Sequence, residues 1–463
     1  MALGGGVWVT QNKILPGSYI NVISAASTSA KLGERGIAAI ALPLGTTSSE
    51  TAGTIVRLTF RQFVNDSKEL LPNAPESTMI ALRELFCNAT EVLVYDSYNG
   101  TQAATKAVVT ITLNGTGTTT GVEITGGTTT VGTLGAETVN SAALSAGYTL
   151  QVNGESKDWT DDSSEVIPTS AVIVLTSNST GPLAGTAKSD FEAITGAISV
   201  QVVDGKQQSQ VDKPTPADIC KALEPYYFNT LACYTDDQTE KAAYINLVKS
   251  WREDVGKKVQ AVVHDAEVAP DYEGIINVVS TVSDDGAPEH ALVAWVTGAE
   301  AGCAVNASVT NKIYDGEYHI VCDHTQIELE DIILAGQFAF HMVYDDIRVL
   351  TDINSLTTVT ETKGEDFKSN QTMRVIDQIA NDIAYMFNTK YIGVIPNDQS
   401  GRTSLWADIV KHHQELETMR AIENFDSSQV VVERGNTKKS VVVTDAVIPV
   451  NAMEQLYMTL VIY

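Results

Sequence analysis

The glycine-rich run GTGTTTG is one of the few places where this sequence could hold chemistry. It carries Gly115, Gly117 and Gly121, a spacing one residue off the G-x-G-x-x-G fingerprint that cradles a dinucleotide. A true fingerprint opens a helix, whereas this run lies among threonines and glycines with no helical pattern after it. Hairpin turns therefore explain these glycines better than a nucleotide site.

The histidines form no recognisable metal or catalytic pattern. His412 and His413 are neighbours in a predicted helix, beside Glu415, and adjacent helical residues point to different faces. They lack the i, i+4 spacing with which two histidines of one helix hold zinc. Two further pairs join a histidine to an aspartate: His264-Asp265 and Asp323-His324. We expect core or solvated histidines, and no G-x-S-x-G or H-E-x-x-H motif occurs.

Carboxylates and thiols carry no clearer signal. Paired aspartates lack the spacing of an EF-hand loop, so solvated turns are the expectation. The pairs are Asp161-Asp162, Asp236-Asp237, Asp284-Asp285 and Asp345-Asp346. The cysteines are odd in number and form no C-x-x-C pair, which argues against a disulfide framework or a zinc site. They are Cys87, Cys220, Cys233, Cys303 and Cys322. The sequence thus predicts no catalytic residue, no metal site and no cofactor.

The charge balance argues against nucleic acid as a partner. The chain has 463 residues, with 57 acidic and 30 basic side chains and a formal net charge of -27. Phosphate contacts need clustered Lys and Arg, so we expect no direct nucleic-acid binding. No stretch is long enough to cross a bilayer, and the start has no basic segment followed by an apolar run. We therefore expect neither membrane insertion nor export by the general secretory route.

Alternating strand and helix patterns predict an α/β body that would position any site. GIAAIALPL reads as a strand, TMIALRELFCNA as an amphipathic helix and EVLVYDS as a strand, which is a βαβ unit. The pattern resumes after Asp212 with TLACY, a helix from Gln238 to Val255 capped by Gly256, and VQAVVHD. In the predicted helix HALVAWVTGAEAG, Gly298 and Gly302 lie one turn apart, where a neighbouring backbone could approach closely.

Between these α/β parts the composition changes sharply. Residues from about 100 to 205 are dominated by Thr, Gly, Val and Ala, in short alternating runs broken by Asn-Gly and Gly-Gly turns. This predicts an all-β insertion that resembles a small sandwich. If one sheet continues across it, one core domain is interrupted by another.

Later segments predict two helices and then strands. TMRVIDQIANDIAYMF and SLWADIVKHHQELETMRAI are the helices, and strands follow from Val430. The chain ends LYMTLVIY, in which both faces of a strand would be mostly apolar. Such a strand left unpaired is an aggregation hazard, so we expect it to pair with another strand.

Six segments stand out in order along the chain: LGGGVWVTQNKILPGSYINVIS, YEGIINVVS, ALVAWVTGAEAGCAVNASVTNKIYDG, DINSLTTVT, FKSNQTMRVIDQIANDI and VIPVNAMEQLYMTLVIY. Together they resemble the contractile tail sheath proteins of myophages, phage-tail-like bacteriocins and defective prophages of Gram-positive bacteria. The resemblance covers both ends and most of the α/β body, and it leaves out the β insertion.

The resemblance implies a subunit of stacked hexameric rings that surround a tail tube and contract to drive the tube through a target envelope. The implied location is a virion or phage-tail-like particle assembled in the bacterial cytoplasm. Its implied partners are further copies of itself, the tail tube protein, and baseplate and tail terminator proteins.

Terminal arms in this family lend strands to the sheets of neighbouring subunits, a form of β-augmentation. Carried onto this chain, the arm residues are Val7, Trp8, Val9, Tyr19, Ile20, Val22, Val441, Val442, Val443, Tyr457, Met458, Thr459, Leu460, Val461 and Ile462. In related sheaths a C-terminal-domain helix faces the tube. Here that helix would run from Ser404 to Arg420, with Lys411 and Arg420 as contacts and Lys438 and Lys439 as further tube-facing residues.

The expected organisation has five parts. They are an N-terminal arm (1–24), a first core segment (25–99), an outward-projecting β insertion (100–205), a second core segment (206–430), and C-terminal strands with an arm (431–463). Two other classes of function stay open at this point. One is a cell-surface adhesin or glycan-binding protein that uses the Thr/Gly-rich β region, and the other is an enzyme with an unrecognised site.

Overall fold

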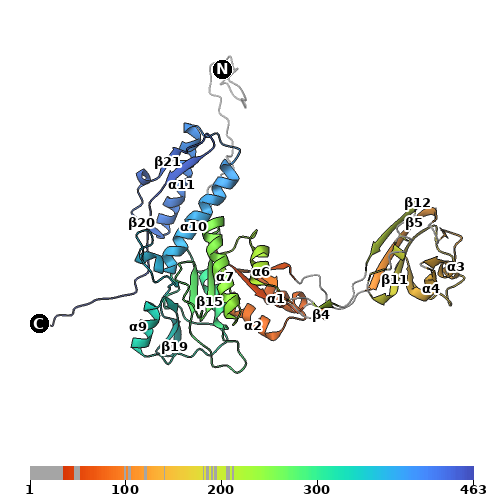
Figure 1. Cartoon of the computed structure of the whole chain (residues 1–463), viewed down its shortest axis with the longest axis horizontal. Coiled ribbons are helices and arrows are strands. Elements are labelled where there is room, and N and C mark those ends of the chain that lie inside the picture. The colour runs from red at the N-terminus through yellow and green to blue at the C-terminus, as the bar shows by residue number, and fades with distance from the viewer. Residues whose placement is uncertain are drawn as a thin grey trace, which may run out of the picture.

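The computed structural model describes residues 35–45, 53–98, 101–102, 106–118, 123–139, 141–180, 182–183, 187–188, 191, 195–204, 209–210 and 213–462. Figure 1 shows a central α/β body, a β unit that stands apart from it, and an elongated C-terminal part. The predicted N-terminal arm residues Val7, Trp8, Val9, Tyr19, Ile20 and Val22 lie outside the described residues.

A seven-stranded sheet forms the centre of the body, in the order β17-β16-β15-β14-β1-β3-β2, and only β2 runs antiparallel to its neighbour. The strands are β1 (Ile37–Leu42), β2 (Ile55–Thr59), β3 (Glu91–Asp96), β14 (Thr230–Ala232), β15 (Gln260–His264), β16 (Ile275–Val278) and β17 (Gln337–Phe338). Because β1 pairs with both β3 and β14, strands from before and after the β insertion share one sheet.

Helices cover both faces of this sheet, which is why its central strands are continuous apolar runs. One face packs against α1 (Phe60–Leu70), α2 (Glu76–Phe86) and α8 (Leu292–Gly302). The other packs against α6 (Pro216–Leu223) and α7 (Gln238–Ser250). The two predicted βαβ units, β1-α2-β3 and β14-α7-β15, are confirmed. Strand β2 and helix α1 were not predicted.

The end of α7 and the contact between α2 and α8 both depend on glycine, as predicted. A π-helical turn, Trp251–Val255, extends α7, and Gly256 caps it with φ of 83°. A Cβ on Gly298 would lie 2.3 Å from the backbone oxygen of Leu85, and one on Gly302 would lie 2.0 Å from that of Asn88. Only glycine therefore lets α8 lie this close to α2.

The main sheet of the β insertion is antiparallel and has the order β10-β9-β11-β5-β12, with β6 also paired to β5. Its strands are β5 (Lys106–Thr118), β6 (Glu123–Thr125), β9 (Tyr148–Val152), β10 (Glu155–Lys157), β11 (Ser170–Thr180) and β12 (Thr195–Val203). Between β6 and β9 lie α3 (Val131–Ala136), β7 (Thr138–Val139), β8 (Ala142–Ala143) and α4 (Leu144–Gly147). At its entry and exit, β4 (Thr101–Gln102) pairs with β13 (Ser209–Gln210).

This packing differs from the predicted sandwich of two sheets. Leu134 of α3 and Leu144 of α4 are fully buried and pack on the sheet with Ile111 and Ile173. Short helices thus take the place of much of a second sheet. A six-residue helix capped by Thr130 has too few turns to leave a helical period in the sequence.

The C-terminal part extends upward from the body in Figure 1. Before it come α9 (Gln326–Leu334), β18 (Phe340–Val343) and β19 (Asp346–Val349), followed by a 3-10 turn, Glu365–Lys368. The part itself contains α10 (Asn370–Met386), a π turn (Phe387–Tyr391), α11 (Gln399–Thr418), β20 (Ile422–Glu423), a 3-10 turn (Ser427–Gln429), β21 (Val431–Arg434), β22 (Val441–Thr444) and β23 (Ile448–Pro449).

Membrane-spanning helices and metal-binding clusters are both absent from the described part of the chain. None of its helices combines the length and the apolar character that a membrane span needs. None of its His, Cys, Asp and Glu side chains form a group of three or more suited to a metal ion.

Candidate functional site: the root of the C-terminal tail

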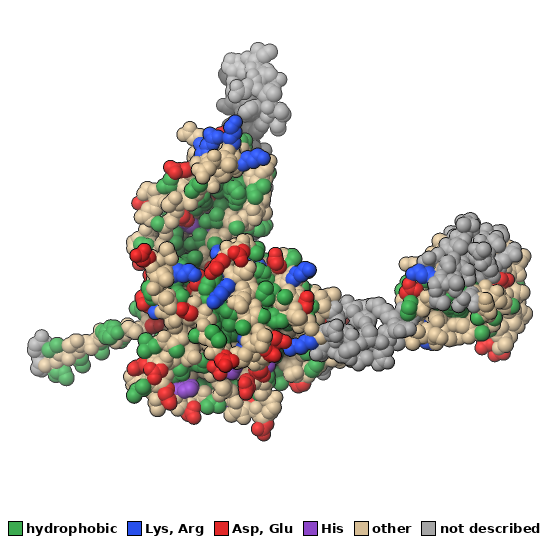
Figure 2. All heavy atoms as spheres, in the orientation of Figure 1, with side chains coloured by type: hydrophobic (Ala, Val, Ile, Leu, Met, Phe, Trp, Pro, Cys, Tyr) green, Lys and Arg blue, Asp and Glu red, His purple; other side chains and the backbone are tan. Residues whose placement is uncertain are grey.

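The last residues of the chain run away from the body as an exposed tail (Figures 1 and 2). Leu456 and Tyr457 are 86% and 87% exposed, and Ile462 is 87% exposed. From Asn451 to Ile462 the tail forms no strand with the rest of the described chain. Exposed apolar surface of this kind marks a binding segment or an aggregation hazard. The pairing of Tyr457, Met458, Thr459, Leu460, Val461 and Ile462 with another copy stays a prediction.

Val441, Val442 and Val443 pair with a strand of their own chain. They belong to β22, which pairs antiparallel with β21 of the same chain, Val443 opposite Val432 and Val441 opposite Arg434. The connecting turn is short and closed by a hydrogen bond from the Gly435 N–H to the Ser440 oxygen (2.9 Å), so local pairing costs little entropy. In this structure these residues are therefore half of a hairpin, and their pairing with another copy stays a prediction.

The root of the tail is the segment from β23 to Glu454, and side chains of α10 hold its backbone. β23 pairs with β20 over only two residues. Beyond it, the Gln371 side chain donates to the Val450 oxygen (3.0 Å) and accepts from the Ala452 N–H (2.9 Å). The Thr372 hydroxyl donates to the Asn451 side chain (3.1 Å).

Glu454 then joins the root to the α/β body. Its two carboxylate oxygens accept hydrogen bonds from the hydroxyls of Thr310 (2.7 Å) and Thr351 (3.0 Å). The Thr310 oxygen in turn accepts from the backbone N–H of Asp352 (2.9 Å). The last fixed point of the tail is therefore tied to a buried polar cluster.

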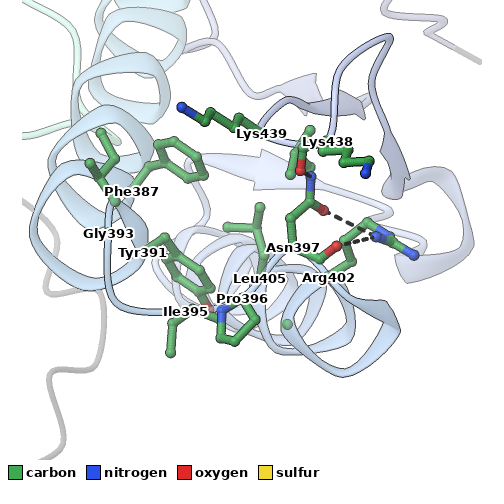
Figure 3. A pocket seen from close by; sticks show the side chains of 13 residues that line it. Phe387, Tyr391, Gly393, Ile395, Pro396, Asn397, Arg402, Leu405, Lys438 and Lys439 are labelled. Carbon is green, nitrogen blue, oxygen red and sulfur yellow. Dashed lines mark hydrogen bonds between the residues drawn. The ribbon is translucent and has the colours of Figure 1, made fainter.

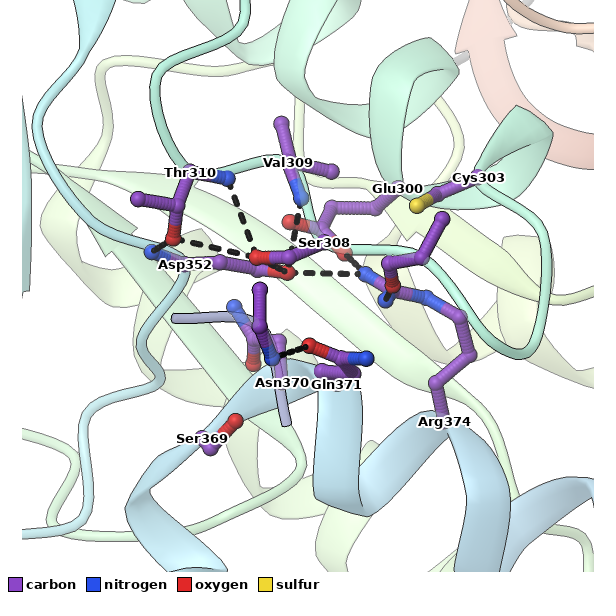
Figure 4. A network of polar contacts seen from close by, with 12 residues as sticks. Glu300, Cys303, Ser308, Val309, Thr310, Asp352, Ser369, Asn370, Gln371 and Arg374 are labelled. Atoms are coloured by element: carbon purple, nitrogen blue, oxygen red, sulfur yellow. Dashed lines mark hydrogen bonds and ion pairs between the residues drawn. The ribbon is translucent and has the colours of Figure 1, made fainter. Parts of the chain in front are cut away.

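That cluster brings one arginine and two carboxylates together inside the protein (Figure 4). Arg374 of α10 lies 2.5 Å from Glu300 of α8 and 3.2 Å from Asp352, measured from its Nη2 atom. Their side chains are 1% exposed or less. Arg374 also donates to the Ala307 oxygen (2.7 Å).

The three groups differ in how burial and charge act on them. Burial opposes the charged form of Asp352, but attraction to Arg374, together with hydrogen bonds from groups that include the Val309 N–H, lowers the Asp352 pKa. Burial, reinforced by repulsion from Asp352, raises the pKa of Glu300 well above its usual range. Burial also opposes the charge on Arg374, yet Asp352 and Glu300 outweigh it and raise the Arg374 pKa. Arg374 thus lies between two carboxyl groups whose pKa values are shifted in opposite directions.

At the other side of the cluster the described chain begins. Arg35 donates to the backbone oxygens of Glu300 (3.1 Å) and Cys303 (3.0 Å) at the end of α8. Burial, together with repulsion from Arg374, lowers the Arg35 pKa to about 10. A second buried pair, Arg252 with Asp377 (2.6 and 2.8 Å), fixes the middle of α10 to the body.

The four predicted tube-facing residues fall into two places. Lys411 lies exposed on α11, 4.0 Å from Glu415, and Arg420 is exposed just after that helix. Lys438 and Lys439 lie in the turn between β21 and β22, where Lys and Arg side chains gather at one end of the molecule (Figure 2). There they line a pocket of about 530 Å³ with Tyr391 and Arg402 (Figure 3). Lys411 and Arg420 do not line it.

His412 and His413 are core residues, one of the two alternatives expected from the sequence. His412 contacts Asp382 of α10 at 3.0 Å, and His413 contacts Asp445 at 2.6 Å. Asp445 comes directly after β22, so His413 helps to position the chain that leads to the tail. Neither these carboxylate partners nor the roles of Gln371 and Glu454 could be predicted, because all of these contacts join residues that are distant in sequence.

Two family models match this chain. Residues 210–355 match the model described as phage tail sheath protein central domain, and residues 362–463 match the phage tail sheath C-terminal domain. Between them they cover the body after the β insertion, the C-terminal part and the tail. The adhesin alternative gains no support from these matches.

Relatives and solved structures agree with those matches. The chain is 28% identical to the phage-like element PBSX protein XkdK of Bacillus subtilis, over 98% of this chain and 99% of the relative. It is 26% identical to the sheath tail protein of Desulfitobacterium hafniense, with a TM-score of 0.61 over 95% of this chain and 98% of the other. The fold is also similar to the helical sheath of the anti-feeding prophage in its contracted state, at 13% identity and a TM-score of 0.56 over 97% and 99%.

Proposed function

This chain belongs to the phage tail sheath family, and on that premise we propose that it polymerises as stacked hexameric rings around a tail tube. The cylinder then contracts and drives the tube through a target envelope. The exposed apolar tail, Leu456–Ile462, is the observation that supports this proposal most directly, since a second copy would give its backbone and side chains a partner. Contraction draws its energy from repacking between subunits and requires no nucleotide.

The hairpin of β21 and β22 is a suitable acceptor for a neighbour's tail. Two strands alone are marginally stable, and among the described residues each strand of this hairpin has one unpaired edge. Val431, Val442 and Val443 of this hairpin are 42%, 51% and 39% exposed. A third strand added at either edge would cover this apolar surface and satisfy backbone groups of both chains.

The same proposal includes contacts with the tail tube, the baseplate and the tail terminator proteins. Lys411 and Arg420, with Lys438 and Lys439, face the tail tube, where exposed charged groups make contacts that can be released when the tube slides. Baseplate and tail terminator proteins cap the cylinder at its ends. The β insertion, residues 100–205, projects outward from the core formed by 25–99 and 206–430, because an added domain on the inner wall would block the tube.

Removal of the tail tests the proposal. A variant that ends at Gln455 should remain a folded monomer or small oligomer, whereas the intact chain should form tubes, rings or short cylinders in negative-stain micrographs. Circular dichroism and thermal unfolding of both proteins show whether the body is intact. Tubes of normal length from the truncated chain would refute the assignment of the tail as a donated strand.

A further inference from the structure

Few backbone hydrogen bonds hold the root of the tail. β23 contributes two residues to its ladder with β20, and one of them, Pro449, has no N–H to donate. The next backbone bond, from the Val450 N–H to the Ala421 oxygen (3.0 Å), is the last in this ladder within the described residues. Whatever fixes the direction of the tail beyond Val450 must therefore be a side chain.

Gln371 has the geometry of a missing strand partner. Its amide donates to the oxygen of Val450 and accepts from the N–H of Ala452, the two groups that a strand partner would bind on one edge of this segment. The side chain is 4% exposed, so its rotamer is fixed by packing and little further entropy is lost in holding the root.

Glu454, two residues after Ala452, provides a second contact between the root and the rest of the chain. It is an exposed residue, yet both of its oxygens are used, by the hydroxyls of Thr310 and Thr351. The Thr310 hydroxyl is itself held by the Asp352 N–H, in the buried cluster with Arg374. After Glu454 the tail has no further anchor in the described chain apart from a contact within itself, Tyr457 to Gln455.

We propose that Gln371 and Glu454 are positioning residues that clamp the root and fix where the donated strand begins. This inference rests on the proposed function, in which the tail pairs with a second copy. A root held by Gln371 and Glu454, in addition to the contact of Thr372 with the Asn451 side chain, leaves fewer conformations for the tail to give up when it pairs, so polymers form at a lower protein concentration. Without the clamp the freely moving segment would begin several residues earlier, near Val450.

The test is the critical concentration for tube formation, measured by sedimentation with the full-length protein. Gln371→Ala and Glu454→Ala should each raise it about tenfold, since each removes two hydrogen bonds of ordinary strength. Thr310→Val, which removes one bond to Glu454, should raise it less. The melting temperature of the unassembled Glu454→Ala protein should be unchanged, because this side chain is exposed.

Two further variants separate the clamp from a general structural effect. Glu454→Gln should assemble nearly as the wild type, because an amide can accept from one threonine hydroxyl and donate to the other. Gln326→Ala is the matched control, since Gln326 is an exposed glutamine of α9 whose amide donates to Glu330 of the same helix.

The outcomes distinguish this inference from the proposed function. Wild-type critical concentrations for both Glu454→Ala and Gln371→Ala would overturn the clamp. If those two variants assemble like the wild type but the chain without Leu456–Tyr463 forms no tubes, the proposal of a donated strand is supported and only the clamp is refuted. If that truncated chain also polymerises normally, the proposed function fails. Should Gln371→Ala unfold the body, Glu454→Ala decides alone.

Discussion

At the scale of single residues, the fold depends on a few charged groups that have no access to water. Arg374, Glu300 and Asp352 connect α10, α8 and the segment that follows β19. A buried ion pair is seldom a net source of stability, but removal of one partner leaves the other uncompensated. The cluster therefore acts as a strict constraint on how these elements meet.

Replacement of Arg374 by methionine should destabilise the body by about 3–5 kcal/mol, because Asp352 would remain buried without its counter-charge. Denaturant unfolding of the unassembled protein measures this loss. Lys411→Met is the matched control: its pair with Glu415 is exposed and 4.0 Å long, so a change within about 0.5 kcal/mol is expected. Equal effects of the two substitutions would contradict the role of the cluster.

Glu84 gives the body a pH dependence of predictable sign. Burial raises its pKa from 4.5 to about 7, although the Tyr314 hydroxyl and the Glu317 N–H both donate to it. The folded protein thus holds a proton that the unfolded chain releases between pH 4.5 and about 7. This contribution to stability is complete below pH 4.5 and falls as the pH rises to about 7.

Melting temperatures of Glu84→Gln and wild type, compared from pH 5 to 8, test that sign. The amide cannot ionise, so the advantage of the variant over the wild type should grow as the pH rises towards 7 and then level off. Glu76→Gln, at an exposed partner of Arg83, serves as the control for the general effect of removing a carboxylate. A difference between Glu84→Gln and wild type that stays constant with pH would contradict the assignment.

At the scale of elements, close helix packing could be predicted from the sequence, whereas buried polar packing could not. Gly298 and Gly302, one turn apart, indicated a close neighbour, and α2 is that neighbour. For α10 the apolar stripe was the visible signal, yet Ile376, Ile379 and Ile383 are only half-buried. Its polar face is the more deeply buried one, with Arg374 and Asp377 paired to distant residues. Amphipathic periodicity assumes that polar side chains face water, and here they face the body.

Gly298→Ala tests the contact between α2 and α8. The new methyl group would meet the Leu85 oxygen at 2.3 Å, so one helix must shift, and we expect a loss of about 1–3 kcal/mol in the free energy of unfolding. Gly147→Ala is the control, because a Cβ there meets nothing within 4 Å. A neutral Gly298→Ala would show that the two helices separate at little cost.

Short elements and the pairing between strands were the features hardest to predict from this sequence. The paired strands β1, which is wholly apolar, and β3, whose four central residues are apolar, were recognised, and so was the strand-helix-strand pattern after Asp212. Strand β2 carries Arg57, which is exposed, and leads directly into α1, so no turn residue separates the two. The hairpin of β21 and β22 contains the expected strands, but sequence alone could not show that they pair with each other.

At the scale of the whole molecule, the β insertion and the tail both extend away from the body. The entry and exit of the insertion run side by side, with Gln102 opposite Ser209, so the body does not depend on it to bring β3 and α6 together. Its apolar core is formed by its own residues. These observations favour an insertion that can be removed without harm to the rest.

Replacement of Lys106–Val203 by a short Gly/Ser linker should therefore leave a folded body that still forms tubes, with a smaller outer diameter and an unchanged inner diameter. Cryo-EM class averages of the two kinds of tube measure both diameters. An inner channel that widens, with the outer wall unchanged, would show that the insertion faces the tube and would contradict the outward placement.

The tail gives the most direct test of the account as a whole. In a cryo-EM reconstruction of the assembled particle at side-chain resolution, the backbone of Tyr457–Ile462 should be hydrogen-bonded to a strand of another copy, with the edge of the β21-β22 hairpin as the expected partner. A reconstruction in which those residues pair only within their own chain, while the cylinder remains intact, would contradict the account.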